Sequence, residues 1–129
     1  MSKKILIADD DELLVKAIVS RLRQYAYEAI YAYDATLAME MAVSQKPDLI
    51  LLDIKMPAGT GKSTLEHLKD AAKTTNIPVI VMTAFPDEEL RHFAASKGAV
   101  DFLEKPFEID CLLDSIKRAL GEENRTEEP

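Results

Sequence analysis

Carboxylates stand at the ends of two apolar segments of this chain, where they could carry out chemistry together. The apolar run at residues 5–8 is followed at once by three aspartates, residues 9–11, and the run at residues 49–52 is followed by Asp53. If the two runs are neighbouring strands of a parallel sheet, their carboxyl ends meet at one edge and these side chains converge. Buried charges of like sign repel each other, so such a group requires protons or a cation.

Two further apolar runs end in side chains that can bind an anion. Thr83 ends the run at residues 79–82, and Lys105 closely follows the run at residues 100–103. A hydroxyl and an ammonium, together with carboxylates that hold Mg²⁺, would make a site for a phosphoryl group. Since a carboxylate can itself accept a phosphoryl group as an aspartyl phosphate, Asp53 is the best-placed acceptor.

Alternating strand and helix patterns must position these side chains, which predicts an α/β fold. We expect a five-stranded parallel sheet in the order 2-1-3-4-5 with helices on both faces, a doubly wound flavodoxin-like fold. The second strand, which alternates in hydropathy, should lie at the sheet edge. The expected strands are residues 4–8, 28–33, 49–52, 78–83 and 100–103, and the expected helices are 11–25, 35–45, 62–72, 86–97 and 107–120.

Composition limits the classes of protein that the chain can belong to. The length of 129 residues predicts one domain, residues 1–121, followed by an acidic tail, residues 122–129, that should be disordered. A net charge of −7 argues against general nucleic-acid binding, and no apolar run approaches a membrane span. One cysteine, Cys111, excludes an internal disulfide and suits the cytoplasm, where we expect the protein.

The motifs in their order resemble a known family over residues 3–120. The chain is similar to the receiver domains of response regulators in two-component signalling, of the chemotaxis-regulator type. The resemblance is carried by residues 7–11 (Ile-Ala-Asp-Asp-Asp), 51–57 (Leu-Leu-Asp-Ile-Lys-Met-Pro), 61 (Gly), 81–84 (Val-Met-Thr-Ala) and 98–107 (Gly-Ala-Val-Asp-Phe-Leu-Glu-Lys-Pro-Phe).

The resemblance implies a role for each residue of the site. Asp53 would be the phosphoryl acceptor, and Asp9 and Asp10 the acidic pair, in which Asp10 ligates Mg²⁺ directly and Asp9 acts through water. The backbone carbonyl of Lys55 would complete the protein ligands of the metal. Thr83 and Lys105 would hold the phosphoryl oxygens, and the Lys105–Pro106 peptide bond would be cis, which aims the ammonium into the crevice.

The same resemblance implies a signalling switch rather than an enzyme with an external substrate. The protein would catalyse only its own phosphorylation and dephosphorylation, with a sensor histidine kinase or phosphotransfer protein as donor and an effector downstream. Thr83 and Phe102 would form the switch, with Phe102 lacking the hydroxyl of the Tyr that is also common there. The responding face, and a possible homodimer contact, would be the fourth helix, fifth strand and fifth helix, with Arg91, Asp101 and Arg118 as exposed charges.

Two other readings compete with the signalling switch. A haloacid-dehalogenase-type phosphatase also uses an aspartyl phosphate, and residues 9–11 contain its Asp-x-Asp, but Leu13 stands where that family requires Thr or Val. That family also needs an acidic pair after its lysine, and none follows Lys105 at a strand end. A pseudo-receiver that only binds protein is disfavoured by the intact acidic residues. A stand-alone receiver and a fragment of a longer regulator or hybrid kinase both fit the sequence.

Several other residues have simpler interpretations. The segment 59–64 (Gly-Thr-Gly-Lys-Ser-Thr) resembles the end of a P-loop, but Met56 replaces the first glycine of that motif. Gly61 is therefore better read as the turn before the third helix. We expect His67 and His92 at the surface, because no metal-ligand partner is spaced for them, and Cys111 as a packed apolar side chain.

Overall fold

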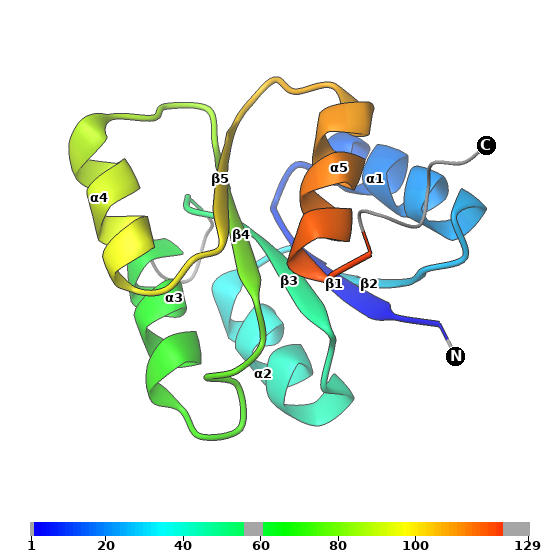
Figure 1. Ribbon diagram of the computed structural model, residues 1–129. Coiled ribbons are helices and arrows are strands. Elements are labelled where there is room, and N and C mark those ends of the chain that lie inside the picture. The colour runs from blue at the N-terminus through cyan, green and yellow to red at the C-terminus, as the bar shows by residue number, and fades with distance from the viewer. Residues whose placement is uncertain (1, 56–60, 123–129) are drawn as a thin grey trace.

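The computed structural model describes residues 2–55 and 61–122, and it contains one parallel sheet between two layers of helices (Figure 1). The sheet has the order β2-β1-β3-β4-β5 that the sequence predicts, with β2 at the edge. The observed element ends differ from the predicted ones by two residues at most. The elements are β1 Lys4–Ala8, α1 Glu12–Gln24, β2 Glu28–Ala32, α2 Ala35–Gln45, β3 Leu49–Asp53, α3 Gly61–Asp70, β4 Val79–Thr83, α4 Glu88–Ser96, β5 Asp101–Glu104 and α5 Ile109–Ala119.

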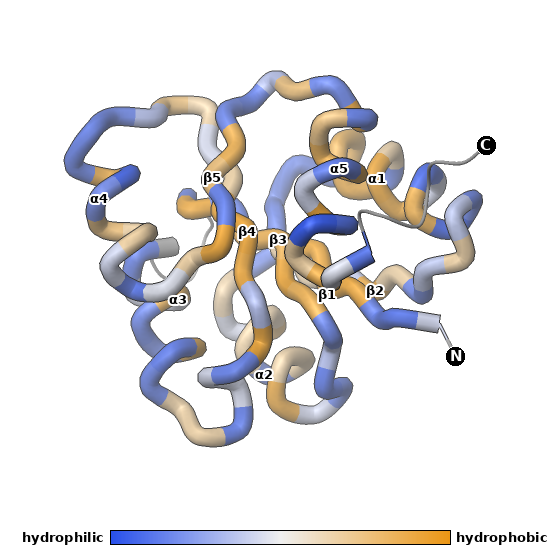
Figure 2. Tube along the Cα trace, in the orientation of Figure 1, coloured by the Kyte–Doolittle hydropathy of each residue, from blue (hydrophilic) through white to orange (hydrophobic). Residues whose placement is uncertain are grey.

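Burial on both faces explains why the central strands read as continuous apolar runs. Every residue of β3 and β4 is buried, and the tube in Figure 2 is hydrophobic along these strands while the outer turns of the helices are hydrophilic. Successive side chains point to opposite faces. Thus Leu52 packs under α2, α3 and α4, whereas Leu51 packs under α1 and α5.

Aspartate caps set the starts of three helices. Asp11, Asp34 and Asp87 each accept a hydrogen bond from the backbone N–H three residues later, which satisfies one of the free donors of the first turn. Asp34 therefore caps the helix that the sequence predicts from residue 35. The predicted helix start at Pro86 is two residues early, because Asp87 takes the cap position and the helix begins at Glu88.

The buried stripe of α1 differs from the predicted one. The helical spacing of apolar residues in the sequence predicts that Leu14, Ala17, Ile18, Leu22 and Tyr25 share the inward face, but the buried residues are Val15, Ile18, Val19 and Leu22. Ala17 is exposed, and Tyr25 is the C-cap residue, 45% exposed, with the cations Arg21 and Lys117 near its ring. Hydropathy alone left two overlapping helical stripes possible, and packing against α5 and the sheet selects one of them.

The last helix corrects two predictions. Its hydropathy pattern predicts that Leu112, Leu113, Ile116 and Leu120 are buried, and α5 buries the first three, but Leu120 lies at the C-cap and is only partly buried. The prediction that Cys111 is a packed apolar side chain is also wrong: Cys111 is exposed, because it precedes the buried pair Leu112 and Leu113 on the helix and lies on the solvent side. His67 and His92 are exposed, as predicted.

The described part of the chain ends at Glu122, the first residue of the predicted acidic tail. Glu122 is held by its backbone N–H, which donates to the carbonyl of Lys117, and by its carboxylate, which accepts from the Tyr27 hydroxyl at 2.9 Å. The prediction that the disordered tail begins at residue 122 is therefore wrong for Glu122, and the rest of that tail, residues 123–129, lies outside the described residues, as do residues 56–60. No helix of the described residues is long and apolar enough to cross a membrane.

Candidate functional site

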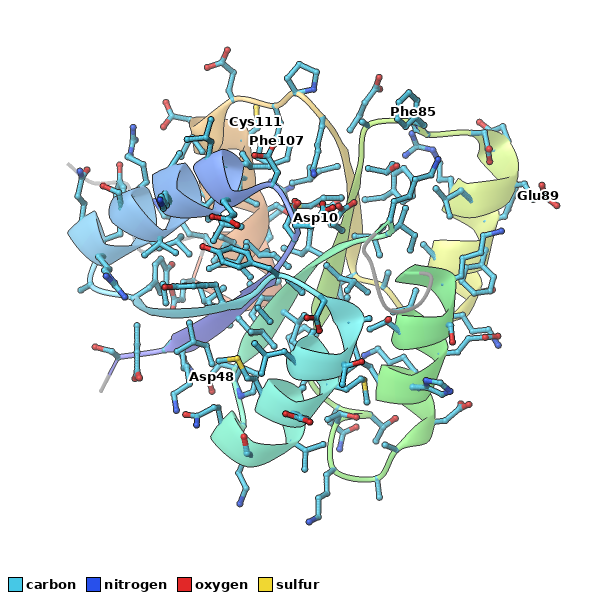
Figure 3. All side chains as sticks on the ribbon, turned by 180° about the vertical axis from the view of Figure 1, so that it is seen from behind. Asp10, Asp48, Phe85, Glu89, Phe107 and Cys111 are labelled. Carbon is cyan, nitrogen blue, oxygen red and sulfur yellow. The ribbon has the colours of Figure 1, made fainter. Side chains whose placement is uncertain are left out.

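The candidate site lies where β1 and β3, the two strands on either side of the change in strand order, end side by side. Ala8 pairs with Leu52 in the parallel register, so Asp9 and Asp53 are the next residues at the same edge. In doubly wound sheets this edge carries the crevice in which ligands bind. Figure 3 shows Asp10 in the middle of this edge, with Phe107 on the α5 side and Phe85 on the α4 side.

Three carboxylates converge at this point, as the sequence predicts. Oxygen atoms of Asp9, Asp10 and Asp53 all lie within 4.8 Å of one another. Asp9 is completely buried and Asp53 is 5% exposed, whereas Asp10 faces solvent. Asp11 is separate from the cluster, because its carboxylate caps α1 and accepts from the N–H of Leu14. The opening to water at Asp10 leaves the cluster accessible to a cation.

Lys105 supplies the positive charge nearest to these carboxylates. Its Nζ lies 2.7 Å from Oδ2 of Asp9 and 3.6 Å from Oδ2 of Asp53. The Asp9 contact is close but poorly aligned, so Oδ2 of Asp9 has no well-formed hydrogen bond. The Lys105–Pro106 peptide bond is cis, as expected. One ammonium faces three carboxylates, which leaves negative charge for a further cation to balance.

The electrostatics of the site raise the pKa of Asp53 when no metal is present. Burial, followed by the negative charges of Asp9 and Asp10, raises this pKa from 3.8 to about 6. The N–H of Lys55 and the charge of Lys105 oppose it. Burial by itself would lower the pKa of Lys105, but contact with Asp9 and the charges of Asp9 and Asp53 outweigh burial and raise it. Lys105 is therefore fully charged at neutral pH.

Lys55 contacts the site through its backbone, and its side chain reaches the ring of Phe85. The backbone N–H of Lys55 donates to Oδ1 of Asp53 at 3.2 Å, which orients the carboxylate. Its exposed ammonium lies 4.8 Å from the ring centre of Phe85, a cation–π distance. Phe85 is 68% exposed and borders a cavity of about 290 Å³ with Ile54, Lys62, Asp87 and Leu90.

Thr83 ends β4 beside the carboxylates, and its side chain already has one partner. It is completely buried, and its Oγ1 accepts a hydrogen bond from the N–H of Phe85 at 3.1 Å. Asp53 of β3 pairs with Met82 of β4, and Thr83 is the next residue of β4. A hydroxyl that accepts one hydrogen bond can still donate its own proton to another oxygen.

Phe102 lies away from the acidic cluster. From β5 it pairs with Val81 of β4, and it packs, half-buried, against the core under α2, α3 and α4. The guanidinium of Arg91 on α4 lies 4.5 Å from its ring centre. The sequence identifies Phe102 and Arg91 as residues of interest, but no sequence pattern predicts the contact between them.

A second contact on β5 and α5 was missed by the sequence reasoning. The buried hydroxyl of Ser115 donates a hydrogen bond to Asp101, and Arg118 lies 3.3 Å from the same carboxylate oxygen. Asp101 is therefore half-buried rather than exposed as expected, while Arg91 and Arg118 are exposed. The only available signal was a serine on the apolar face of α5.

Comparisons with known proteins agree with this geometry. The family model described as "Response regulator receiver domain" matches residues 5–117. Response regulator PleD from Caulobacter vibrioides is 38% identical over 120 residues, 93% of this chain and 26% of PleD. Polar-differentiation response regulator DivK from Brucella anthropi is 31% identical over 122 residues, 95% of this chain and 99% of DivK. The chain thus spans about a quarter of the first relative and nearly all of the second.

One solved structure is informative about the crevice. The receiver domain of sensor histidine kinase PA1611 from Pseudomonas aeruginosa PAO1 matches with a TM-score of 0.84 and 26% identity, over 94% of this chain and 99% of that one. That structure has a magnesium ion coordinated in its active site cleft.

Proposed function

The chain belongs to the response regulator receiver domain family, and we propose that Asp53 is the residue on which it accepts a phosphoryl group from a partner histidine kinase. Receiver domains of two-component response regulators are phosphorylated on aspartate. The observation that supports Asp53 is its position. It is the carboxylate of the cluster that is itself the last residue of a buried strand, and it lies beside Asp9 and Asp10 with the ammonium of Lys105 at 3.6 Å.

The proposed transfer moves one phosphoryl group between two proteins. A carboxylate oxygen of Asp53 forms a bond to phosphorus, and the bond from phosphorus to the phosphohistidine nitrogen breaks. The electron pair of that bond returns to the imidazole, which then takes a proton. Lys105 and the Thr83 hydroxyl bind the phosphoryl oxygens, and the N–H of Lys55 holds the acceptor carboxylate in place.

Receiver domains bind Mg²⁺ through an acidic cluster, and the donors here fit that ion. Asp10 would ligate it directly, Asp9 through water, and Asp53 with the carbonyl of Lys55 would complete the protein ligands. Such donors are oxygen atoms, which Mg²⁺ prefers, and the excess negative charge beside Lys105 favours a dication. When bound, Mg²⁺ neutralises charge on the transferring phosphoryl group.

The output we propose is a change of binding surface. A phosphoryl oxygen at Asp53 attracts the Thr83 hydroxyl, and the space that this frees lets Phe102 turn inward, which biases a two-state element. The face of α4, β5 and α5 would then bind an effector or a second copy of the chain. Relatives of this chain are regulators, and we propose that it acts in the cytoplasm on no substrate but its own aspartate, without direct nucleic-acid contact.

The competing phosphatase reading is weakened by Asp11. In an Asp-x-Asp phosphatase the second aspartate must reach the reacting group, yet here its carboxylate accepts from the N–H of Leu14 as the cap of α1. It therefore stands outside the cluster that Asp9, Asp10 and Asp53 form.

Phosphorylation by a small acyl phosphate tests the proposal directly. With Mg²⁺, the wild type should gain the mass of one phosphoryl group, which hydroxylamine removes because it attacks acyl phosphates. Asp53→Asn should not gain it, since an amide is not nucleophilic. Asp114→Asn, an exposed site on α5, is the matched control and should be labelled normally. Label retained in Asp53→Asn, or turnover of a generic phosphate ester, would refute the assignment.

A further inference from the structure

A groove runs along the outer edge of the molecule, between α1 and the edge strand β2, away from the acidic cluster. It measures about 420 Å³ and combines apolar, aromatic and cationic side chains. It is lined by Val15, Val19, Lys16, Arg23, Tyr31 and Tyr33.

The aromatic part of the groove leaves an apolar surface beside an open sheet edge. Tyr31 is 44% exposed, and its ring lies 5.3 Å from that of Tyr33. Within the described residues β2 pairs only with β1, so its other edge has no strand partner. Natural proteins commonly cover or charge such an edge, because it can pair with other chains.

The other part of the groove is positively charged. Lys16 is exposed and forms no ion pair among residues 2–55 and 61–122, and Arg23 donates one hydrogen bond to the carbonyl of Ala29. Glu12 begins α1 one helical turn before Lys16, beyond the lining residues of the groove, and is close enough to Tyr33 to add to the rise that burial causes in the pKa of that tyrosine. Glu28 faces the opposite side of the strand, since side chains alternate. An acidic occupant would therefore bind at the Lys16–Arg23 end.

The chain carries an acidic segment within reach of this end. Residues 123–129 contain three glutamates and one arginine, and the preceding Glu122 is fixed by the Tyr27 hydroxyl. Tyr27 follows α1 directly, and its N–H bonds to the carbonyl of Leu22, next to Arg23. Seven extended residues span up to about 23 Å, whereas α1 rises only about 10 Å from Arg23 to Lys16.

We propose that residues 123–129 dock along the groove between α1 and β2, with their glutamates facing Lys16 and Arg23, and cover the open edge of β2. The net charge of the whole chain is negative, so an acidic segment is repelled by most of the surface and attracted to this local pair of cations. The inference does not depend on the phosphoryl-acceptor role of Asp53.

Paramagnetic broadening in the 129-residue chain tests the docking. A nitroxide is attached at Pro129→Cys in a Cys111→Ser background, and amide signals are recorded with the label oxidised and reduced. We expect broadening at Lys16, Val19 and Tyr31, and its loss in about 0.5 M salt, where screening shortens the range of charge interactions to a few Å.

Variants separate charge pairing from proximity. Changing Glu123, Glu127 and Glu128 together to Gln should abolish most of the broadening while the segment keeps its length. Lys16→Gln should weaken the broadening, whereas the control Lys73→Gln, at an exposed lysine outside the groove, should not.

Two results would overturn the proposal. One is broadening confined to the neighbourhood of Tyr27 and unchanged by salt or by the glutamine variant. The other is broadening of an unlabelled, isotope-enriched chain mixed with labelled chains, which would show that the groove takes the segment of a second copy.

Discussion

Replacing Asp53 with Asn should stabilise the metal-free protein at neutral pH, although it removes the proposed acceptor. Burial and the neighbouring carboxylates raise the pKa of Asp53 from 3.8 to about 6. In the unfolded chain the carboxyl ionises at its ordinary value. Between these two values the folded state binds more protons than the unfolded state, so the stability of the wild type falls as the pH rises through this window.

The size of the effect follows from the shift. The rise in the pKa of Asp53 from 3.8 to about 6 corresponds to a loss of about 3 kcal/mol in the free energy of unfolding once the pH is above 6. Asn has no charge to bury, and its side-chain oxygen can still accept from the N–H of Lys55. We therefore expect Asp53→Asn to gain about 2–3 kcal/mol over the wild type at pH 7.5, and close to nothing at pH 4, where both forms are neutral.

Urea denaturation of both proteins, in chelator at pH 4 and pH 7.5, measures this difference. Asp114→Asn, at an exposed position, should change the free energy of unfolding by less than about 0.5 kcal/mol at either pH. Saturating Mg²⁺ should shrink the gain, because a cation stabilises the ionised carboxylate only in the wild type. A gain that is equal at both pH values, or a loss at pH 7.5, would refute the electrostatic reasoning.

Three further predictions concern the proposed site. Asp10→Ala should abolish acyl-phosphate labelling at Mg²⁺ concentrations that saturate the wild type, and labelling of the wild type in excess chelator would contradict a metal requirement. Phe85→Ala should speed loss of the acyl phosphate severalfold, and adding Lys55→Asn should speed it further, because we expect their cation–π pair to shield the approach of water. Mass spectrometry follows the decay of the acyl phosphate, and an unchanged or slower decay in Phe85→Ala would contradict this reasoning. Phosphorylation should shift NMR signals across residues 84–118 in the wild type but not in Thr83→Ala, and shifts restricted to the surroundings of Asp53 would argue against this coupling.

The general fold and the composition of the site could be read from the sequence. Strands buried on both faces appear as short continuous apolar runs, and their ends are marked by the polar residues that follow, such as Asp53 after β3. Chain connectivity then restricts the strand order, which is why Asp9 and Asp53 could be placed together without coordinates.

The tertiary structure alone determined which side chains are buried and which charges lie in contact, because both depend on packing between residues that are distant in the sequence. It selected Val15 and Val19 over Ala17 as the buried side of α1, and it exposed Cys111. It placed Lys105 closer to Asp9, at 2.7 Å, than to Asp53, at 3.6 Å. Sequence patterns report local periodicity and connectivity, whereas these contacts depend on which side chains fill the same space in a close-packed interior.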